Sequence, residues 1–426
     1  MKILIFSQHF PPETVATGRR AQDLAESLSG RGHNVTVVTG VPNHPSSMVR
    51  PGCRAAPGVE VVAGCYRVVR VPVFRSTDTR VLHRLLTYGT FLLSAVRDGL
   101  RQGPADLILA VSPLPTGLAA MLIHWARRAP LVFDLQDIWP DSVLAVGVMR
   151  PSLALRLLRG VEQFFYRRCA LIVCITEGFR RYLLGLGISP ARVAVIHNGV
   201  DVEMFEGCKN SDEFRAAHLP GGKFVVGYVG NIGLAQGLGT LLDAAAALAD
   251  RPVTFLLTGE GTDKERLQTL ARIRELANVK FLDGVPRERV PTILASCDAL
   301  LLALRRDPLF EITIPSKLYE YMAAGKPIIC SVGGEAASLV ATAQCGLSVA
   351  PSDGAALAAA IRKLHEDPAL CRAMGEMGRR FVRESFSRVH LMDEYCELIE
   401  RLVSKTEEPA VWAVPHQSET LSSRKL

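Results

Sequence analysis

The sequence lacks the patterns of a membrane-spanning, secreted or disulfide-rich protein. No apolar run reaches the roughly 18 residues that a membrane span requires, and the apolar opening from Met1 to Phe6 has neither the length nor the cleavage site of a signal peptide. The ten cysteines include no Cys-x-x-Cys pair, and Cys169, Cys174, Cys330 and Cys345 stand in apolar stretches. We therefore expect a cytoplasmic protein whose cysteines are buried free thiols.

Three kinds of binding site are also disfavoured by what is missing. The first strand is not followed by a tight Gly-x-Gly-x-x-Gly turn, so a classical dinucleotide site is disfavoured. No Asp-x-Asp pair or other metal cluster stands out, so we expect no metal and no cofactor. Nucleic acid is disfavoured as a partner because no helix-turn-helix, zinc or aromatic-basic motif is present.

What is present is a long, apolar chain with an uneven charge. Its 426 residues are 48% hydrophobic and 21% charged, which is enough for two or three domains with sizeable cores. The net charge of +7 is concentrated in residues 1–205, which hold 23 Lys and Arg against 14 Asp and Glu. A basic first half suits an anionic surface or an anionic acceptor.

Short apolar strands alternate with helical patterns along most of the chain, which predicts an α/β protein with parallel sheets. The expected strands are residues 2–6, 35–38, a pair within 59–71, 107–111, 131–133, 171–175, 193–196, 224–229, 253–257, 279–282, 299–303 and 328–331. Polar loops at the carboxyl ends of such strands are where open α/β sheets bind ligands. One of these loops, residues 134–142, contains Asp134, Asp137 and Asp141. Asp134 is either functional or a buried hydrogen-bonded carboxylate, and Asp141 either functional or a helix cap.

The most informative run is residues 311–327, which reads Glu-Ile-Thr-Ile-Pro-Ser-Lys-Leu-Tyr-Glu-Tyr-Met-Ala-Ala-Gly-Lys-Pro. Pro315 suits a helix start and Gly325 a helix end, so Ser316 and Lys317 are expected at a helix N-terminus. Backbone N–H groups, the helix dipole and the Lys317 ammonium can together bind phosphate. Glu320, one turn along, can accept hydrogen bonds from ribose hydroxyls. For a Ser-Lys pair alone, an ordinary capped surface helix is the stronger reading.

This run, continued by residues 328–331, resembles the signature of the family 4 retaining glycosyltransferases, and in particular the branch of bacterial colanic acid and O-antigen L-fucosamine transferases. The wider family carries two glutamates eight positions apart. Here Ile312 stands eight positions before Glu320, and the nearest acid is Glu311, an offset that the branch shares. The resemblance implies the GT-B fold, two Rossmann-like domains that face a cleft, and extends to about residue 404.

The resemblance also implies a set of site residues. Asp137, Glu311 and Lys317 are the expected catalytic residues. The expected donor-binding residues are Gly18, Asn231, Gln236, Gly259, Glu260, Gly284, Val285, Ser316, Lys317, Leu318 and Glu320. Relatives carry Arg and Lys where this chain has Asn231 and Gln236, so Arg305, Arg306 or Lys317 has to supply the missing charge. The alternative reading of the first loop, which ends at Gly18, is a mobile surface loop.

The implied domain order is an acceptor-binding domain over residues 1–204, a nucleotide-sugar-binding domain over residues 205–385, a helix over 386–404 that crosses back, and a disordered tail over 405–426. The first domain closes on residues 197–201, His-Asn-Gly-Val-Asp, where the family has Pro in place of His197. Asn-Gly suffices for the turn.

The resulting hypothesis is a metal-independent, retaining transferase that moves a sugar, expected to be an N-acetylated hexosamine or deoxyhexosamine, from a UDP-sugar to a polyprenyl-diphosphate-linked sugar or a glycan in surface polysaccharide biosynthesis. No pair of carboxylates is placed as nucleophile and acid, so a double displacement is not indicated. A nucleotide-sugar 2-epimerase and a catalytically silent sugar-nucleotide-binding partner remain alternatives.

Residues 75–100 combine Arg80, Arg84 and Arg97 with a continuous apolar side. This pattern fits either a helix that lies on the cytoplasmic membrane face or an ordinary core-packing helix.

Overall fold

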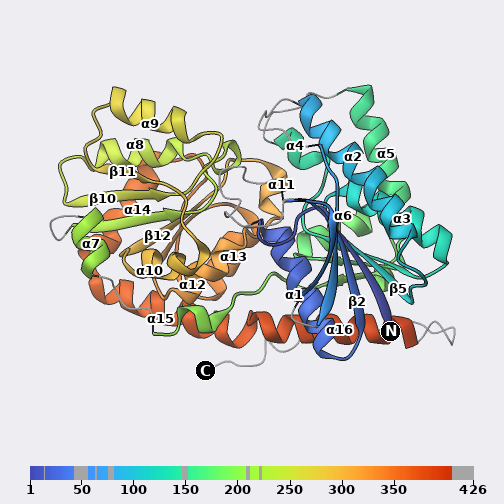
Figure 1. Cartoon of the computed structure of the whole chain (residues 1–426). Helices are drawn as coiled ribbons and strands as arrows, with labels where there is room; N and C mark the ends of the chain where they lie inside the picture. Colours follow the sequence, from blue (N-terminus) through green and yellow to red (C-terminus); the bar gives the residue numbers. More distant parts are fainter. Residues whose placement is uncertain are drawn as a thin grey trace.

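The computed structural model of the chain describes residues 1–404, apart from residue 14 and residues 43–55, 63–64, 75–80, 146–151, 208–211 and 220–222. It contains two sheets, one in each half of the chain, with helices on both faces of each (Figure 1). The tail expected over residues 405–426 lies outside the described residues.

The first half of the chain forms an eight-stranded sheet in the order β3-β4-β2-β1-β5-β6-β7-β8. Its strands are β1 (Lys2–Ser7), β2 (Asn34–Gly40), β3 (Gly58–Val62), β4 (Tyr66–Val71), β5 (Leu107–Val111), β6 (Leu131–Leu135), β7 (Leu171–Cys174) and β8 (Val193–Val195). The helices among them are α1 (Ala16–Gly30), α2 (Val81–Leu100), α3 (Leu114–Arg127), α4 (Asp141–Ala145), α5 (Leu153–Arg168) and α6 (Glu177–Gly185). All pairs of strands are parallel except β3 with β4.

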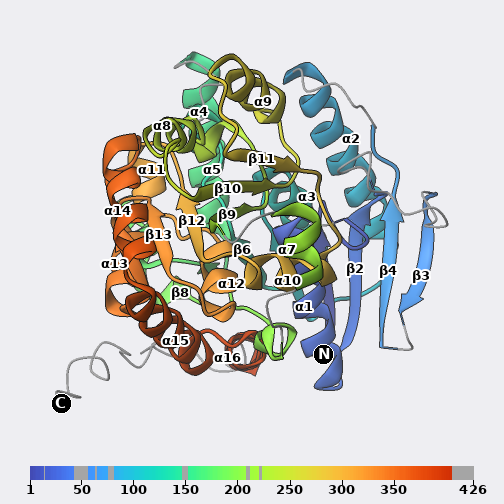
Figure 2. The ribbon, with the colours of Figure 1, turned by 90° about the vertical axis from the view of Figure 1, so that its left-hand side faces the viewer.

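The second half forms a parallel six-stranded sheet in the order β11-β10-β9-β12-β13-β14, which Figure 2 views from its own side of the molecule. Its strands are β9 (Phe224–Val229), β10 (Val253–Thr258), β11 (Val279–Leu282), β12 (Ala299–Ala303), β13 (Ile328–Ser331) and β14 (Gly346–Ser348). Its helices are α7 (Asp212–His218), α8 (Gly239–Ala247), α9 (Lys264–Ile273), α10 (Val290–Ala295), α11 (Pro308–Glu311), α12 (Lys317–Ala323), α13 (Gly334–Thr342), α14 (Gly354–Glu366), α15 (Pro368–Ser385) and α16 (Arg388–Ser404).

The central strands are mostly apolar because helices cover both faces of each sheet. Every residue of β5, β6 and β10 is buried, which explains why these strands read as continuous apolar runs instead of alternating patterns. The four cysteines expected to be buried are free thiols with buried side chains, and burial raises the pKa of the Cys330 and Cys345 thiols. Because neighbouring strands run parallel, the loops that follow their carboxyl ends lie together at one edge of each sheet.

The two halves are joined at two places that lie side by side. The chain crosses from the first half near Val200 and returns near Phe386: the N–H of Val200 donates to the Phe386 carbonyl at 3.0 Å, and the N–H of Arg388 donates to the Val200 carbonyl at 2.9 Å. Helix α16 then runs along the first half beside α1 (Figure 1). Arg31 and Glu400 form an ion pair between these helices at 3.2 Å.

Candidate functional site

The carboxyl ends of the two sheets face each other where the two halves meet. Thr176 follows β7 of the first sheet, and its hydroxyl donates to the carbonyl of Ile312, in the segment after β12 of the second sheet, at 2.7 Å. Ile312 and Leu309 pack against the apolar core of the first half. The predicted site residues of both halves lie on loops at these two edges, as the parallel topology requires.

Lys317 is the central cation of the second edge. It is the first residue of α12; its Nζ atom donates to the Tyr228 hydroxyl at 2.5 Å and lies 4.0 Å from the centroid of the Tyr228 ring. A side chain at Gly230 would come within 3.0 Å of the same Nζ, so this glycine leaves the ammonium room. Burial lowers the pKa of Lys317 to about 7, although Glu320 acts to raise it. A bound anion would restore the full charge of this lysine.

The loops after β9 and β10 pack backbone against backbone beside this lysine. The N–H of Gly230 donates to the Thr258 carbonyl at 2.9 Å, and a Cβ atom at Gly259 would lie only 1.9 Å from the Gly230 oxygen. Gly230 and Gly259 have φ angles of +134° and +148°, which L side chains rarely adopt. Glycine is therefore required at both positions, because a side chain at either one would be strained and, at Gly259, would overlap the backbone of the neighbouring loop.

The Gln236 side chain is turned toward its own loop, whereas Asn231 is exposed. The Gln236 Oε1 atom accepts from the N–H of Gly233 at 3.0 Å, and the backbone oxygen of Asn231 accepts from the Tyr228 hydroxyl at 2.6 Å. The N–H of Arg305 donates to the Ala235 carbonyl at 2.9 Å, which places Arg305 on this same loop.

Two of the three cations considered as replacements for the family's Arg and Lys therefore lie here, Arg305 beside the loop and Lys317 beneath Gly230. The third, Arg306, is an exposed residue next along the chain.

Glu260, Gly284 and Val285 come together at the outer end of the same edge. The N–H of Gly284 donates to the Glu260 carboxylate at 2.9 Å, and the Lys264 ammonium donates to the same oxygen at 3.2 Å. Val285 is partly buried against the core. The structure therefore joins these predicted residues into one corner of the second edge.

The run from Glu311 to Glu320 forms a loop followed by α12. Glu311 is exposed, and a Cβ atom at Gly333 would lie 3.8 Å from its Oε1 atom. Glu320 lies 3.7 Å from the Arg287 guanidinium. Both carboxylates thus remain within reach of solvent in the same loop region.

The start of α12 agrees only in part with the expectation of free N–H groups. Ser316 is the N-cap and its hydroxyl makes no capping hydrogen bond, so this hydroxyl occupies none of the N–H groups of the first turn. The N–H of Leu318 is occupied by the Pro315 carbonyl at 2.9 Å, and the Leu318 side chain is fully buried. Leu318 therefore acts as a core residue of the helix.

The first edge carries Gly18 and Asp137. A Cβ atom at Gly18 would lie 3.1 Å from the backbone of His9 and Phe10, so this glycine lets α1 pack closely against the loop after β1. Asp137 accepts a hydrogen bond from the Ser142 hydroxyl at 2.8 Å. The Asp137 side chain is open to solvent, yet the surrounding protein desolvates it enough to raise the pKa.

The other two acids of this loop have structural partners. Asp134 is fully buried and paired with Arg20, with the Nε atom 3.0 Å from the carboxylate, which supports the buried-carboxylate reading. Arg20 also lies over the Tyr395 ring of α16, 5.2 Å from its centroid. Asp141 opens α4 and pairs with Arg159 at 2.6 Å.

Tyr228, Thr176, Arg181 and the pair Gly333-Gly334 were not predicted from the sequence. Gly333 and Gly334 stand directly between β13 and α13, at the carboxyl edge, and a Cβ atom at Gly334 would lie 1.8 Å from the Glu311 carbonyl oxygen. A Gly-Gly pair that follows a predicted strand is a signal that could have indicated them. Tyr228 lies within a strand and carries no such signal.

Comparisons with known proteins agree with this geometry. Residues 210–381 match the family described as "Glycosyl transferases group 1", and residues 16–199 match the "Glycosyl transferase 4-like domain". The putative colanic acid biosynthesis glycosyl transferase WcaI of Escherichia coli is 27% identical over 76% of this chain and 82% of its own length. The glycogen synthase of Mycobacterium tuberculosis is 26% identical over 91% of both chains.

Solved structures show the same fold. Sucrose-phosphate synthase from Thermosynechococcus elongatus aligns with a TM-score of 0.78 at 20% identity, over 95% of this chain and 99% of its own. Anabaena Alr3699/HepE in complex with UDP-glucose aligns with a TM-score of 0.71 at 20% identity, over 94% and 100%. The GT-B fold expected from the sequence is thereby confirmed: two parallel-sheet α/β domains that face each other.

Proposed function

Because the chain belongs to the group 1 glycosyltransferases and has a family 4-like first domain, we propose that it transfers a sugar, an N-acetylated hexosamine or deoxyhexosamine, from a UDP-sugar to a lipid-linked or glycan acceptor, with retention at the anomeric carbon. The product would be part of a bacterial surface polysaccharide. Two relatives are named for colanic acid biosynthesis, and a solved neighbour was captured with UDP-glucose, which supports this choice of pathway and donor.

The observation that carries the proposal is the partly buried Lys317 ammonium beside the Gly230 and Gly259 loops. A cation with backbone groups around it and little water suits a diphosphate whose charge grows as the sugar leaves. In this mechanism the leaving phosphate takes the acceptor proton, and Lys317 stabilises the developing charge. Glu320 accepts hydrogen bonds from ribose hydroxyls, while Glu311 and Asp137 face the sugar and the acceptor.

We further propose that the first domain docks on the inner face of the cell membrane, where a polyprenyl-diphosphate acceptor would present its sugar. Helix α2 packs inward through Phe91 and Ala95, as a core-packing helix does, and leaves Leu85 and Leu93 exposed on its other side, where they could contact a membrane. Arg80 lies outside the described residues. Among the described residues, no helix is long and apolar enough to cross a membrane.

The neighbouring helices α3 and α5 extend this exposed apolar surface, which we call the outer helix face (Figure 1). Its exposed large apolar side chains are Leu85, Leu86, Leu93, Leu122, Trp125, Leu153, Leu157, Val161 and Phe164. On α5 these recur at Leu153, Leu157, Val161 and Phe164, the spacing of one helical stripe. Arg156, Arg167 and Arg168 flank the stripe and are exposed, which suits anionic lipid.

The proposed function is tested by incubating the protein with a panel of UDP-sugars and a lipid-diphosphate sugar acceptor. We expect one donor to give a glycosylated lipid with the donor's anomeric configuration. A sugar changed at C2 without an acceptor would identify the 2-epimerase instead. Binding of a UDP-sugar without turnover would identify a silent binding partner, for which the uncharged Asn231 and Gln236 are the supporting observation.

A further inference from the structure

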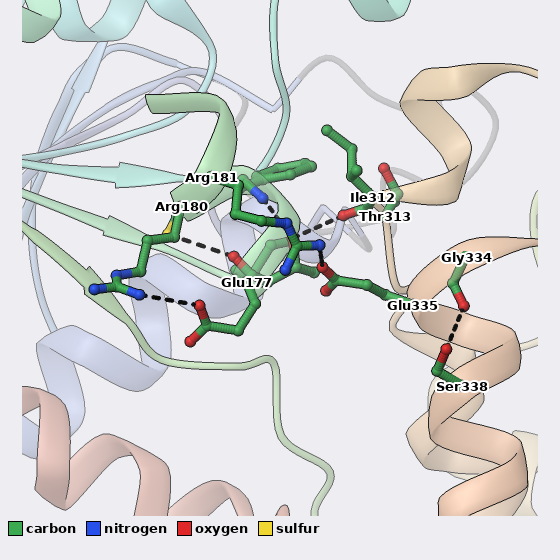
Figure 3. Close-up of polar contacts among 12 residues, drawn as sticks. Glu177, Arg180, Arg181, Ile312, Thr313, Gly334, Glu335 and Ser338 are labelled. Atoms are coloured by element: carbon green, nitrogen blue, oxygen red, sulfur yellow. Dashed lines mark hydrogen bonds and ion pairs between the residues drawn. The ribbon is translucent and has the colours of Figure 1, made fainter. Parts of the chain in front are cut away.

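The two domains contact each other through a small polar cluster (Figure 3). It includes Ile312, which lies between α11 and α12 in the segment that we call the donor loop. On the first domain it involves the start of α6, with Thr176 as N-cap. On the second domain it involves Ile312, next to Glu311, and Glu335 in the first turn of α13. The Arg181 guanidinium lies 2.6 Å from the Glu335 carboxylate across the interface. We call this set of contacts the α6–α13 latch.

The Thr176 hydroxyl makes one hydrogen bond within the first domain and one to the second domain. The hydroxyl oxygen accepts from the N–H of Phe179 at 3.1 Å, which caps α6, and the hydroxyl hydrogen goes to the Ile312 carbonyl at 2.7 Å. The end of the donor loop is therefore fixed directly onto the start of a first-domain helix. Ile312 also buries part of its side chain against the first-domain core, so both polar and apolar contacts hold this loop.

Gly178 makes this close approach possible. A Cβ atom built there would lie 2.4 Å from the Cβ of Ile312 and 2.8 Å from the Glu335 Oε1 atom. Gly178 is the second residue of α6 and does not have a positive φ angle, so glycine is not needed there for the local conformation. Glycine is required here because the second domain lies too close to leave room for a side chain.

The latch is connected to Glu311 through α13. Gly334, which precedes Glu335, packs so closely on Glu311 that a Cβ atom would meet the Glu311 carbonyl oxygen at 1.8 Å. The contact that Arg181 makes with Glu335 thus bears on the backbone that carries Glu311. The position of the first domain and the position of this carboxylate are set by the same contacts.

We propose that Arg181 and Gly178 are positioning residues that hold the closed arrangement of the two domains and thereby fix the Glu311 loop for sugar transfer. Arg181 and Gly178 belong to the first domain, whereas Lys317 and the loops of Gly230 and Gly259 belong to the second. The latch therefore acts on the alignment of donor and acceptor and leaves the affinity for the nucleotide alone.

The decisive variant is Gly178→Ala in the full chain. Alanine favours the helix locally, so α6 itself is not destabilised, while the added methyl group forces the domains apart. We expect kcat to fall at least tenfold, the Kd for UDP to stay within about twofold, and the radius of gyration from small-angle scattering to increase. A wild-type kcat and an unchanged radius of gyration would overturn the proposal.

Charge reversal gives a second, independent test. Arg181 is largely exposed, and exposed ion pairs contribute little, so Arg181→Ala should lower kcat only about two- to fivefold. Arg181→Glu and Glu335→Arg should each lower it further, and the double variant should recover most of the loss. No recovery in the double variant would contradict a direct pair.

Arg180→Ala is the matched control, because Arg180 pairs with Glu177 on its own helix at 3.4 Å and points away from the second domain (Figure 3). It should leave kcat and the scattering curve unchanged. The kcat readout rests on the proposed function, but the scattering and UDP-binding readouts do not. If Gly178→Ala increases the radius of gyration but wild type shows no detectable sugar transfer, the proposed latch stands and the proposed transferase function is rejected.

Discussion

At the residue scale, Lys317 combines two properties that are separable by experiment, its charge and its unusual proton affinity. If its ammonium stabilises the leaving diphosphate, Lys317→Ala should lower kcat by about two to three powers of ten. The fold should survive, because the Lys317 ammonium donates only to Tyr228 among the described residues. Single-turnover kinetics and a thermal melt would measure the two effects. Wild-type turnover would place the diphosphate elsewhere.

The lowered pKa of Lys317 predicts proton uptake on donor binding. At pH 8, above its pKa of about 7, the free enzyme holds this lysine mostly neutral. A bound diphosphate favours the charged form and raises the pKa, so binding takes up a proton, and UDP affinity falls as the pH rises above 7. Calorimetry at pH 8 in two buffers of different ionisation enthalpy measures the uptake. Lys317→Arg, charged at every pH, should abolish it.

Glu320→Gln addresses donor binding instead of the chemical step. The substitution keeps the shape of the side chain and removes the charged acceptor, so the Kd for UDP should rise by about tenfold. Arg287, its ion-pair partner at 3.7 Å, should matter less. Titration of Glu320→Gln and of an Arg287 variant with UDP would measure the two changes in Kd. Equal affinities for Glu320→Gln and wild type would remove Glu320 from the ribose site.

We also predict that activity does not depend on a metal ion. Among the described residues, no group of three or more His, Cys, Asp or Glu side chains is placed to hold one. The Lys317 ammonium and the glycine loops are instead expected to balance the charge of the diphosphate. Activity should therefore persist in excess EDTA. Complete loss that Mg²⁺ or Mn²⁺ restores would defeat this prediction.

At the element scale, the close packing of the β9 and β10 loops gives a stability prediction. Gly259→Ala would place a methyl group against the Gly230 oxygen, 1.9 Å away, and force a residue with a side chain into a φ angle of +148°. We expect a loss of about 1–3 kcal/mol in the free energy of unfolding, together with weaker UDP binding. Denaturant titration would measure the first effect.

Gly239→Ala is the control for this substitution, because a Cβ atom there meets nothing within 4 Å. This variant should unfold within about 0.5 kcal/mol of wild type. A Gly259→Ala protein as stable as Gly239→Ala would mean that the two loops can move apart.

The elements themselves were largely predictable, and particular residues show why. Apolar runs such as residues 107–111 and 253–257 became buried parallel strands, because a strand covered by helices on both faces buries every side chain and therefore reads as a short continuous run. β14, Gly346–Ser348, was missed because it is short and not fully buried. Local helix signals predicted the start of α12 at Ser316 and Lys317, whereas Glu311 and the catalytic role of Lys317 were predicted only from the family resemblance.

Partners from distant segments were not predictable. Arg181 pairs with Glu335, and Tyr228 with Lys317, across 154 and 89 residues of chain, and no local pattern announces either contact.

At the scale of the whole molecule, the outer helix face predicts salt-sensitive membrane binding. Each arginine near an anionic surface contributes about 1 kcal/mol, so Arg156, Arg167 and Arg168 changed together to Gln should weaken binding to anionic liposomes by about two powers of ten. Leu153→Ser with Leu157→Ser should also release the protein, because membrane contact needs both charge and apolar area. Cosedimentation at low salt would measure both.

Ile273→Ser with Val389→Ser is the control, since these side chains are equally exposed but lie on α9 and α16, away from the outer helix face. Turnover on a short soluble acceptor should stay unchanged in all three variants. If wild type never binds the liposomes, the outer helix face has another purpose and the acceptor need not be at a membrane.

The return of α16 to the first domain has a consequence for how the protein is made. Helix α16 follows the whole second domain in the chain, yet Tyr395 covers the buried Arg20–Asp134 pair and Glu400 pairs with Arg31, all in the first domain. The first domain therefore emerges with an uncovered apolar groove along α1 and keeps it open while the whole second domain is synthesised. We therefore expect that a chain cut short before α16 would leave the surface of α1 that this helix covers exposed to water.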